Sequence, residues 1–258
     1  MRNIVVYTVV SNGCDNLRAP AVIDSSFRYI CFTNTPQIVS VHPWEFRPLY
    51  MPNGMSPARY SRLPKILPHL FFDADASIYH DANFSLLHRP QDLVNGLLRP
   101  GVDVALHAHP GRRCLYDEGE LCANSNIGDP VQISIQLDAY RRAGHPRNWG
   151  LWACGFMVRR HSPELLAFNE RWYTEFELGC ARDQISFPFA ARNTGIGINT
   201  LSDRIYGNEW VRFHWHAAWK TKDDNPNFIP ERLRLQDRFD RLREIAGSDE
   251  RTTYDAHA

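Results

Sequence analysis

RYSRLPKILPHLFFDADASIYHDAN, residues 59–83, is the stretch of sequence that decides the fold. Its first half contains helix-forming residues, but Pro64 and Pro68 interrupt them, so we expect a kinked or broken helix. Its second half contains a short β-rich run at residues 76–80, and Asp81 comes directly after that run. A helical segment followed by a strand indicates α/β structure, in which ligand-binding residues lie just beyond the carboxyl ends of strands.

Outward from this stretch, apolar runs predict further strands, and Asp-Pro and Ser-Pro pairs mark the starts of helices. We expect strands at residues 3–10, 27–33, 102–107 and 151–158, and helices at 130–142 and 163–176. Their alternation predicts a single α/β domain over residues 1–222. The remaining residues, 223–258, carry apolar side chains at helical spacing and are predicted to form a C-terminal helical tail. A peripheral membrane contact is the alternative role for that tail.

The composition excludes several classes of protein. The chain has 258 residues, with 29 Lys plus Arg against 29 Asp plus Glu, so it has no net charge that would attract nucleic acid. The first residues lack the features of a signal peptide, and no stretch reaches the ~20 apolar residues that cross a bilayer. We therefore expect a cytoplasmic protein. The six cysteines form no Cys-x-x-Cys pair and are predicted to be reduced, largely buried thiols.

Two pairs of metal-binding side chains compete within the deciding stretch. Asp73 and Asp75 form a literal D-x-D, whereas Asp81 and Asn83 supply one carboxylate and one amide oxygen, both of which suit a hard divalent cation. Position favours Asp81 because it directly follows a predicted strand. Asp73 lies too close to Pro68 for a central strand to precede it.

Three cations precede these acids at a spacing of three residues. Arg59, Arg62 and Lys65 would share one face of a helical turn, and cations beside acids are typical of a metal-bound phosphate site. The alternative is a solvated helix face that carries only surface ion pairs.

Seven segments in order resemble the glycosyltransferase-like domain family found in bacteria and in plant mucilage-related proteins. They run from about residue 7 to about residue 220: YTVVSNGCDNL, RYICFTN, ARYSRLPKILPH, SIYHDANF, HPGRRCLYDE, GLWACGFMVRRH and RDQISF. The resemblance implies a GT-A-like, Rossmann-like fold with a mixed sheet. It also implies sugar transfer from a nucleotide-sugar donor, a UDP-sugar first of all, to a hydroxyl of a glycan or glycolipid in surface polysaccharide synthesis. The implied cofactor is Mn²⁺ or Mg²⁺.

The resemblance also implies a set of donor-binding residues at the ends of strands and on the broken helix. They are Thr8, Asn34, Arg59, Arg62, Lys65 and Gly155. Thr8 and Asn34 would contact the nucleobase and ribose, and the three cations would face the diphosphate. Gly155 would let a sugar approach the backbone, although a glycine within a strand also marks a bulge. Asp81 and Asn83 would bind the metal, with Asn83 the weaker ligand because an amide replaces the usual acid.

The segment FHWHAAWK resembles the part of glycogenin-like transferases in which a His binds the metal and a Lys holds the leaving diphosphate. His214 and Lys220 match those roles, although Ala217 replaces the usual Gly. His216 is the alternative metal ligand. An aromatic-rich core with histidines bonded to backbone is the competing interpretation.

Asp183 and Gln184 resemble the Asp-Gln position of related transferases, where the carboxylate meets the sugar near the anomeric carbon. Asp183 alternatively caps the helix that follows. The glycogenin-like spacing favours retention of configuration, whereas Asp183 or Glu118 acting as a base would support inversion.

Two other functions remain open from the sequence. His107 and His109 lie on one face of a predicted strand and would hold zinc in a metal-dependent hydrolase, with Cys114, Asp117 or Glu118 as a further ligand. The seven tryptophans alternatively suit a non-catalytic glycan-binding domain, in which their rings stack on sugars.

Overall fold

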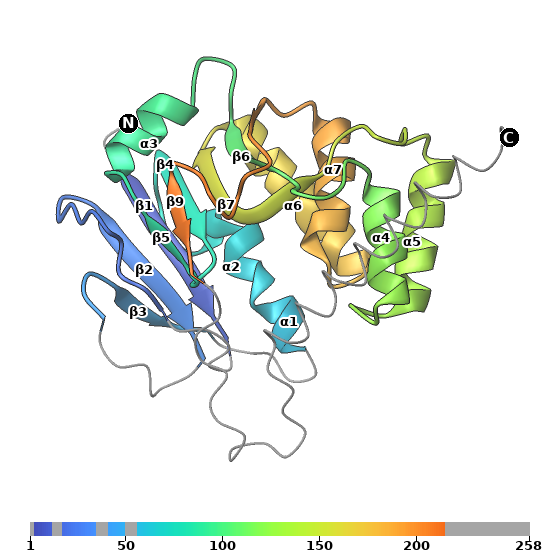
Figure 1. Cartoon of the computed structure of the whole chain (residues 1–258), viewed down its shortest axis with the longest axis horizontal. Coiled ribbons are helices and arrows are strands. Elements are labelled where there is room, and N and C mark those ends of the chain that lie inside the picture. The colour runs from blue at the N-terminus through green and yellow to red at the C-terminus, as the bar shows by residue number, and fades with distance from the viewer. Residues whose placement is uncertain (1–2, 12–16, 35–40, 50–55, 215–258) are drawn as a thin grey trace, which may run out of the picture. The chain divides into compact units, whose positions relative to one another are not determined.

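Nine strands are present in the computed structural model, which describes residues 3–11, 17–34, 41–49 and 56–214. In chain order they are β1 Ile4–Val10, β2 Arg28–Thr33, β3 Glu45–Pro48, β4 Ala76–His80, β5 Phe84–Leu86, β6 Val104–Ala108, β7 Trp152–Arg160, β8 Ile198–Leu201 and β9 Val211–Phe213. Seven of them form one sheet in the order β3-β2-β1-β4-β7-β6-β8, and β5 pairs with β9 in a separate sheet (Figure 1).

The large sheet is mixed. β1 pairs in parallel with β2 and β4, whereas β7 runs antiparallel to both β4 and β6. From β1 the chain moves outward to β2 and β3 on one side and then crosses to β4 on the other. Such a reversal of strand order opens a crevice at the carboxyl ends of the strands, which is where α/β proteins bind ligands.

Helices cover both faces of this sheet. The chain forms α1 Pro57–Tyr60, α2 Arg62–Ile66, the 3₁₀ turn η1 Pro68–Leu70, α3 Pro90–Leu97, α4 Leu115–Asn124, α5 Pro130–Arg142, α6 Pro163–Leu178 and α7 Asp183–Thr194. Side chains of α2, α6 and α7 share a core with one face, and α3 with the β5–β9 pair covers the other. A third core joins α4 and α5 to α7.

Local signals explain where the helices begin and break. The Asp129 carboxylate accepts from the amides of the first turn of α5, and the Ser162 hydroxyl accepts from the Leu165 amide at the start of α6. The predicted broken helix is confirmed, because α1 ends before Ser61 and α2 ends before Pro68. The α/β class, the mixed sheet and the flanking helices that were predicted from the sequence are likewise confirmed.

The chain divides into two units, residues 1–213 and 214–258. The tail predicted over residues 223–258 lies outside the described residues. Within the described ranges, no helix is both long and apolar enough to cross a membrane.

Candidate active site

Asp81 lies immediately beyond the carboxyl end of β4, next to the point in the sheet where the strand order reverses. The competing pair lies at the opposite end of the same strand. There the Asp75 carboxylate accepts from the Asn3 amide, and the Asp73 carbonyl accepts from the Asn3 side chain. The position of Asp81 thus agrees with the prediction made from its place in the sequence.

Two neighbours hold the Asp81 carboxylate in place. The Tyr79 hydroxyl donates to Asp81 Oδ1 at 2.6 Å, and the Asp81 amide donates to the Gly155 carbonyl at 2.9 Å. A Cβ at Gly155 would lie 3.0 Å from Asp81 Oδ2, so the missing side chain leaves room for the carboxylate. The Asp81 side chain is 42% exposed and therefore accessible to a ligand.

Gly155 also lies in a bulge. On β6, Leu106 pairs with Met157 but His107 pairs with Ala153, so residues 154–156 have no partner in that ladder. Bulges aim nearby side chains and occur next to active sites. The bulge interpretation of Gly155 is confirmed, and the close approach of a sugar stays a prediction; the group that lies close to Gly155 here is the Asp81 carboxylate.

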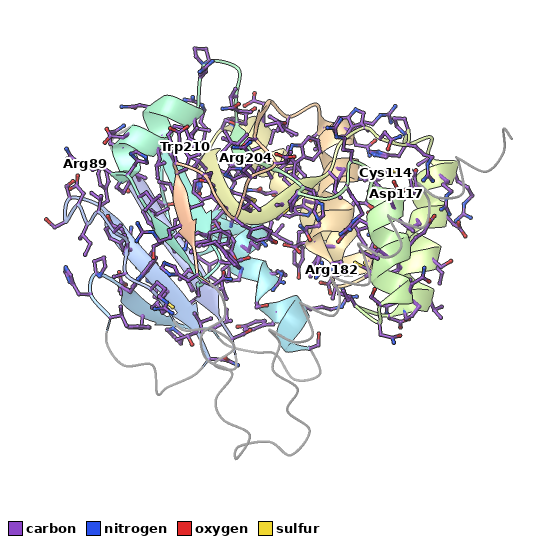
Figure 2. All side chains as sticks on the ribbon, viewed as in Figure 1. Arg89, Cys114, Asp117, Arg182, Arg204 and Trp210 are labelled. Atoms are coloured by element: carbon purple, nitrogen blue, oxygen red, sulfur yellow. The ribbon has the colours of Figure 1, made fainter. Side chains whose placement is uncertain are left out.

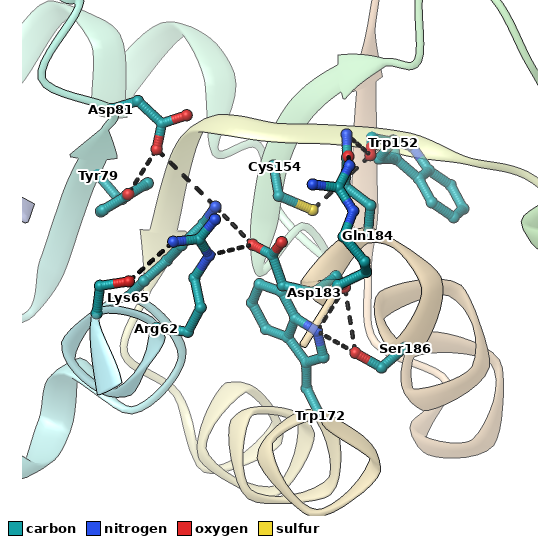
Figure 3. A network of polar contacts seen from close by, with 12 residues as sticks. Arg62, Lys65, Tyr79, Asp81, Trp152, Cys154, Trp172, Asp183, Gln184 and Ser186 are labelled. Carbon is teal, nitrogen blue, oxygen red and sulfur yellow. Dashed lines mark hydrogen bonds and ion pairs between the residues drawn. The ribbon is translucent and has the colours of Figure 1, made fainter. Parts of the chain in front are cut away.

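A buried ion pair joins this edge to the start of α7 (Figure 3). Lys65 Nζ lies 2.6 Å from Asp183 Oδ2 and 3.9 Å from Asp81 Oδ1, and Arg62 Nε lies 3.6 Å from Asp183 Oδ2. Lys65 Nζ also lies 5.0 Å from the centre of the Tyr79 ring. Lys65 and Asp183 are both nearly inaccessible to solvent, with side chains 4% and 5% exposed.

Asp183 is the first residue of α7 and not its N-cap, which is Arg182. Burial alone would raise the pKa of the Asp183 carboxyl, but the charges of Lys65, Arg62 and Arg182 hold it well below its usual range. Trp172 fixes the backbone here, since its indole N–H donates to the Asp183 carbonyl at 3.0 Å. The capping interpretation is therefore wrong: the carboxylate faces cations of α2.

Arg59 does not join Arg62 and Lys65. Its guanidinium donates to the carbonyls of Phe176, Glu177 and Gly179, at the C-terminal end of α6. The prediction that three cations share one face is wrong: Arg59 lies on α1 and binds the end of α6, whereas Arg62 and Lys65 lie on the separate helix α2. Arg62 and Lys65 converge on Asp183 instead of lining a common surface.

Thr8 is not at a strand end. β1 continues to Val10, and β2 and β4 flank it on both sides, so Thr8 is completely inaccessible to solvent. Its predicted contact with a nucleobase is wrong in this conformation. Asn34 does follow the last residue of β2 directly, at the carboxyl edge of the sheet, and is partly exposed.

Gln184 is tied to a second buried cluster. The guanidinium of Arg182, a residue labelled in Figure 2, donates to Gln184 Oε1 at 3.1 Å and approaches Oε1 of Glu118, a residue of α4, at 3.5 Å. Arg112 binds the other Glu118 oxygen at 2.5 Å. Burial would raise the pKa of Glu118, but Arg112, His109 and Arg182 lower it below its usual value. Glu118, 2% exposed and paired twice, is therefore not an accessible base.

The zinc site expected at His107 and His109 does not form. His107 is completely buried, and its Nδ1 donates to the Ser202 carbonyl at 2.7 Å. His109 Nδ1 accepts from the backbone amides of Gly111 and Arg112. Burial, with the charges of Arg112 and Arg182, lowers the pKa of His109 to about 4. Within the ranges that the structure describes, no three His, Cys, Asp or Glu side chains are grouped so as to hold a metal ion.

Of the other residues predicted to bind the metal or the diphosphate, the structure describes only Asn83 and His214. Asn83 lies in the turn between β4 and β5 and is 7% exposed. Phe213, the residue before His214, pairs with Phe84, the residue after Asn83. His214 itself begins the second unit, and its role as a ligand stays a prediction. His216 and Lys220 lie outside the described residues.

Sequence reasoning missed Tyr79 and the role of Trp172. Tyr79 precedes Asp81 by two residues, and the alternation of side chains along an extended segment places positions two apart on one face. That spacing was a usable signal for the hydroxyl that binds Asp81. No local pattern links Trp172 to Asp183, because the contact depends on how α6 packs on α7.

Two comparisons of the sequence with known proteins point to one family. Residues 52–201, more than half of the chain, match the family described as TOD1/MUCI70, glycosyltransferase-like domain. The probable hexosyltransferase MUCI70 of Arabidopsis thaliana is 24% identical over 270 residues, which covers 94% of this chain and 44% of that protein. This chain therefore spans less than half the length of that relative.

Two solved structures are similar at low sequence identity. Mouse xyloside xylosyltransferase 1 in its apo form has a TM-score of 0.46 and 10% identity, covering 85% of this chain and 99% of that one. The apo WbbM bifunctional glycosyltransferase has a TM-score of 0.46 and 12% identity, covering 78% and 39%. The family match itself runs from just before α1 to the end of β8 and includes Lys65, Asp81 and Asp183. The chain thus belongs to the TOD1/MUCI70 glycosyltransferase-like domain family.

Proposed function

We propose that this chain transfers a sugar from a UDP-sugar donor to a hydroxyl of a glycan or glycolipid, at the carboxyl edge of the sheet beside Asp81, Lys65 and Asp183. One observation carries the proposal. An exposed carboxylate at the carboxyl end of β4 and a buried one at the start of α7 share a single buried ammonium group, which lies 3.9 Å from one and 2.6 Å from the other. Membership of a glycosyltransferase-like family supports the reaction class.

The donor's diphosphate needs positive charge when the anomeric bond breaks. Lys65 and Arg62 carry two positive charges and Asp81 and Asp183 two negative ones, so these four side chains together add no net charge. A divalent cation would supply the missing charge and neutralise the leaving diphosphate. The accessible carboxylate of Asp81 would hold Mn²⁺ or Mg²⁺, with Asn83 as a weaker oxygen donor.

The oxygen donors that are described fit such an ion. Mg²⁺ is commonly held by one or two protein carboxylates and the phosphates of the substrate, so Asp81 needs no complete cage of protein ligands. His214 would add a ligand and Lys220 would contact the diphosphate, as the resemblance to glycogenin-like transferases implies.

Asp183 would act on the sugar. Its low pKa keeps the carboxylate ionised at neutral pH, and from its buried place it would stabilise positive charge at the anomeric carbon through its electric field and not by direct contact. Lys65 and Arg62 hold it at a fixed place beside Asp81. Gln184 would have its side chain oriented by Arg182.

Binding of UDP in the presence of Mn²⁺ tests the proposal. A ligand at a hundred times its Kd stabilises a protein by about 2.7 kcal/mol, so UDP with Mn²⁺ should raise the melting temperature of the wild type. Asp81→Ala should abolish that rise, measured by differential scanning fluorimetry and by calorimetric titration. Asp73→Ala is the matched control, because Asp73 is exposed at the opposite end of β4 and should leave the rise unchanged.

Two results would contradict the proposal. UDP that stabilises wild type and Asp81→Ala equally would remove Asp81 from the site. No response of the wild type to UDP or any UDP-sugar, with or without Mn²⁺, would remove the proposed donor class. Release of UDP from a panel of UDP-sugars then identifies the donor sugar.

A further inference from the structure

Arg159 is an arginine buried in the main core. It lies on β7, opposite Ser77 of β4 and Val104 of β6, and is completely inaccessible to solvent. None of the carboxylates in the described ranges pairs with it, and its Nε and Nη2 have no hydrogen-bond partner there. Burial lowers the pKa of Arg159 to about 9, which leaves the side chain charged at neutral pH. Burying an unpaired charge is costly, so the position calls for a compensating role.

The contacts of Arg159 lead to the candidate active site. Its Nη1 donates to the backbone carbonyl of Lys65 at 2.9 Å, and the Tyr7 hydroxyl donates to the same carbonyl at 3.3 Å. The guanidinium carbon also lies 5.7 Å from the centre of the Tyr7 ring. Two donors from the sheet thus converge on one carbonyl, and that carbonyl belongs to the residue whose ammonium joins Asp81 to Asp183.

The helix that carries Lys65 needs such support. α2 has five residues and contains Pro64, and a helix this short leaves its last carbonyls without partners in the helix. A cation at the C-terminal end of a helix is favourable because it interacts with the free carbonyls there. Arg159 supplies that cation from β7, which belongs to the rigid sheet.

We propose that Arg159 is a positioning residue, which holds the backbone of Lys65 so that its ammonium reaches Asp183 and Asp81. This inference rests on the proposed function for the meaning of the Lys65–Asp183 pair. The contribution of Arg159 to the stability of the Lys65–Asp183 pair is a property of the folded chain. It can therefore be measured by unfolding, separately from catalysis.

The neighbouring Arg160 provides a matched control. It too is an arginine of β7 that donates to backbone carbonyls, at 2.8 Å to Leu98 and 3.3 Å to Val102. Those carbonyls follow α3, on the other side of the sheet from α2. Arg160→Met should thus cost stability through the same kind of bond without moving Lys65.

The first test is a double-mutant cycle measured by urea unfolding of the full chain. Arg159→Met should lower the urea midpoint, and the loss should be no more than about half as large in a Lys65→Met background, because that background no longer contains the Lys65–Asp183 pair that Arg159 is proposed to hold. Arg160→Met should lower the urea midpoint by the same amount in the wild-type and the Lys65→Met backgrounds. Should Arg159→Met not fold, Arg159→Lys enters the same cycle. Equal losses in both backgrounds would overturn the proposal.

The second test uses the turnover of the UDP-sugar that the panel identifies. Arg159→Met should lower kcat at least about tenfold with a KM for the donor within about threefold of wild type, since stabilisation of the transition state is lost and binding is kept. Arg159→Lys should restore part of kcat, and Arg160→Met should leave it unchanged. A kcat for Arg159→Met equal to that of Arg160→Met would overturn the proposal. If no UDP-sugar binds the wild type, the proposed function fails. The double-mutant unfolding cycle then tests by itself whether Arg159 positions Lys65.

Discussion

At the scale of single residues, the unusual feature of this protein is the number of charges that it buries. Lys65 and Asp183 are paired at 2.6 Å, Glu118 is held between Arg112 and Arg182, and Arg159 has no carboxylate partner in the described ranges. Buried ion pairs contribute little to stability compared with apolar residues of the same size, but removing one partner is strongly destabilising. Residues that are costly to bury are candidates for function.

Replacing Asp183 by Asn tests the buried pair. We expect Asp183→Asn to lower the free energy of unfolding by about 3 kcal/mol at pH 7, because Lys65 stays buried without its counter-charge. Asp117→Asn is the control, since Asp117 pairs with Arg147 at the surface, and should change it by at most about 0.5 kcal/mol.

The free energy of unfolding that Asp183→Asn removes should depend on pH. The pKa of Asp183 in the folded chain lies below its value in the unfolded chain, so the folded state binds fewer protons between those two values. The stabilisation is therefore complete above about pH 5 and is lost as the pH falls below about 4. Urea unfolding should show a smaller difference in the free energy of unfolding between wild type and Asp183→Asn at pH 3 than at pH 7. A difference of the same size at both pH values would contradict an ionised, paired Asp183.

At the scale of elements, the broken helix before β4 determines which cations reach the site. α1 and α2 would present Arg59, Arg62 and Lys65 on one face if they were continuous. Arg59 on α1 binds the carbonyls at the end of α6, whereas Arg62 and Lys65 on α2 lie beside Asp183. The two short helices thus carry different roles: α1 contributes a contact with α6, and α2 contributes two residues of the candidate site.

Arg59→Met tests this division of roles. It removes hydrogen bonds from a charged donor to three carbonyls of the α6 end, so we expect the free energy of unfolding to fall by about 1–2 kcal/mol. The affinity for UDP should stay within about twofold of wild type, because Arg59 does not contact the Lys65–Asp183 pair. Arg113→Met, at an exposed position, is the control for stability. A large loss of UDP affinity in Arg59→Met would return Arg59 to the diphosphate site.

At the scale of the whole molecule, three apolar cores surround the sheet and its outer helices, and the cysteines are distributed among them. Cys154 lies in the core shared with α6 and α7, Cys31 in the core beneath α3, and Cys122 between α4 and α5. All five cysteines that the structure describes are free and buried, as their scattered spacing predicted.

The thiols therefore report global unfolding. Burial raises the pKa of Cys31 and Cys122 to about 12, and a buried, protonated thiol does not react. A thiol reagent at pH 8 should label no more than one of the six cysteines in the native protein and all six in urea. Labelling of two or more native thiols within minutes would show that at least one core opens without global unfolding.

Most of the secondary structure could be predicted from the sequence because its signals are local. Apolar runs identified β1, β2, β4, β6 and β7, and the Asp129-Pro130 and Ser162-Pro163 pairs identified the starts of α5 and α6 to the residue. The two prolines of the deciding stretch predicted its broken helix. The preference for Asp81 over Asp73 also came from local order, since it required only the knowledge of which acid follows a strand.

The contacts that make the candidate site depend on tertiary structure. Lys65 and Asp183 are far apart in the sequence and meet because α2 and α7 pack on the same face of the sheet. The burial of Thr8 follows from the strands that flank β1, and the partner of Arg59 from the packing of α6. Local propensity is set by the residue and its neighbours in the chain, and it determined the elements of this protein. The environment of a charged side chain is set by whichever segments the fold brings around it, so only the tertiary structure decided which cations meet which carboxylates.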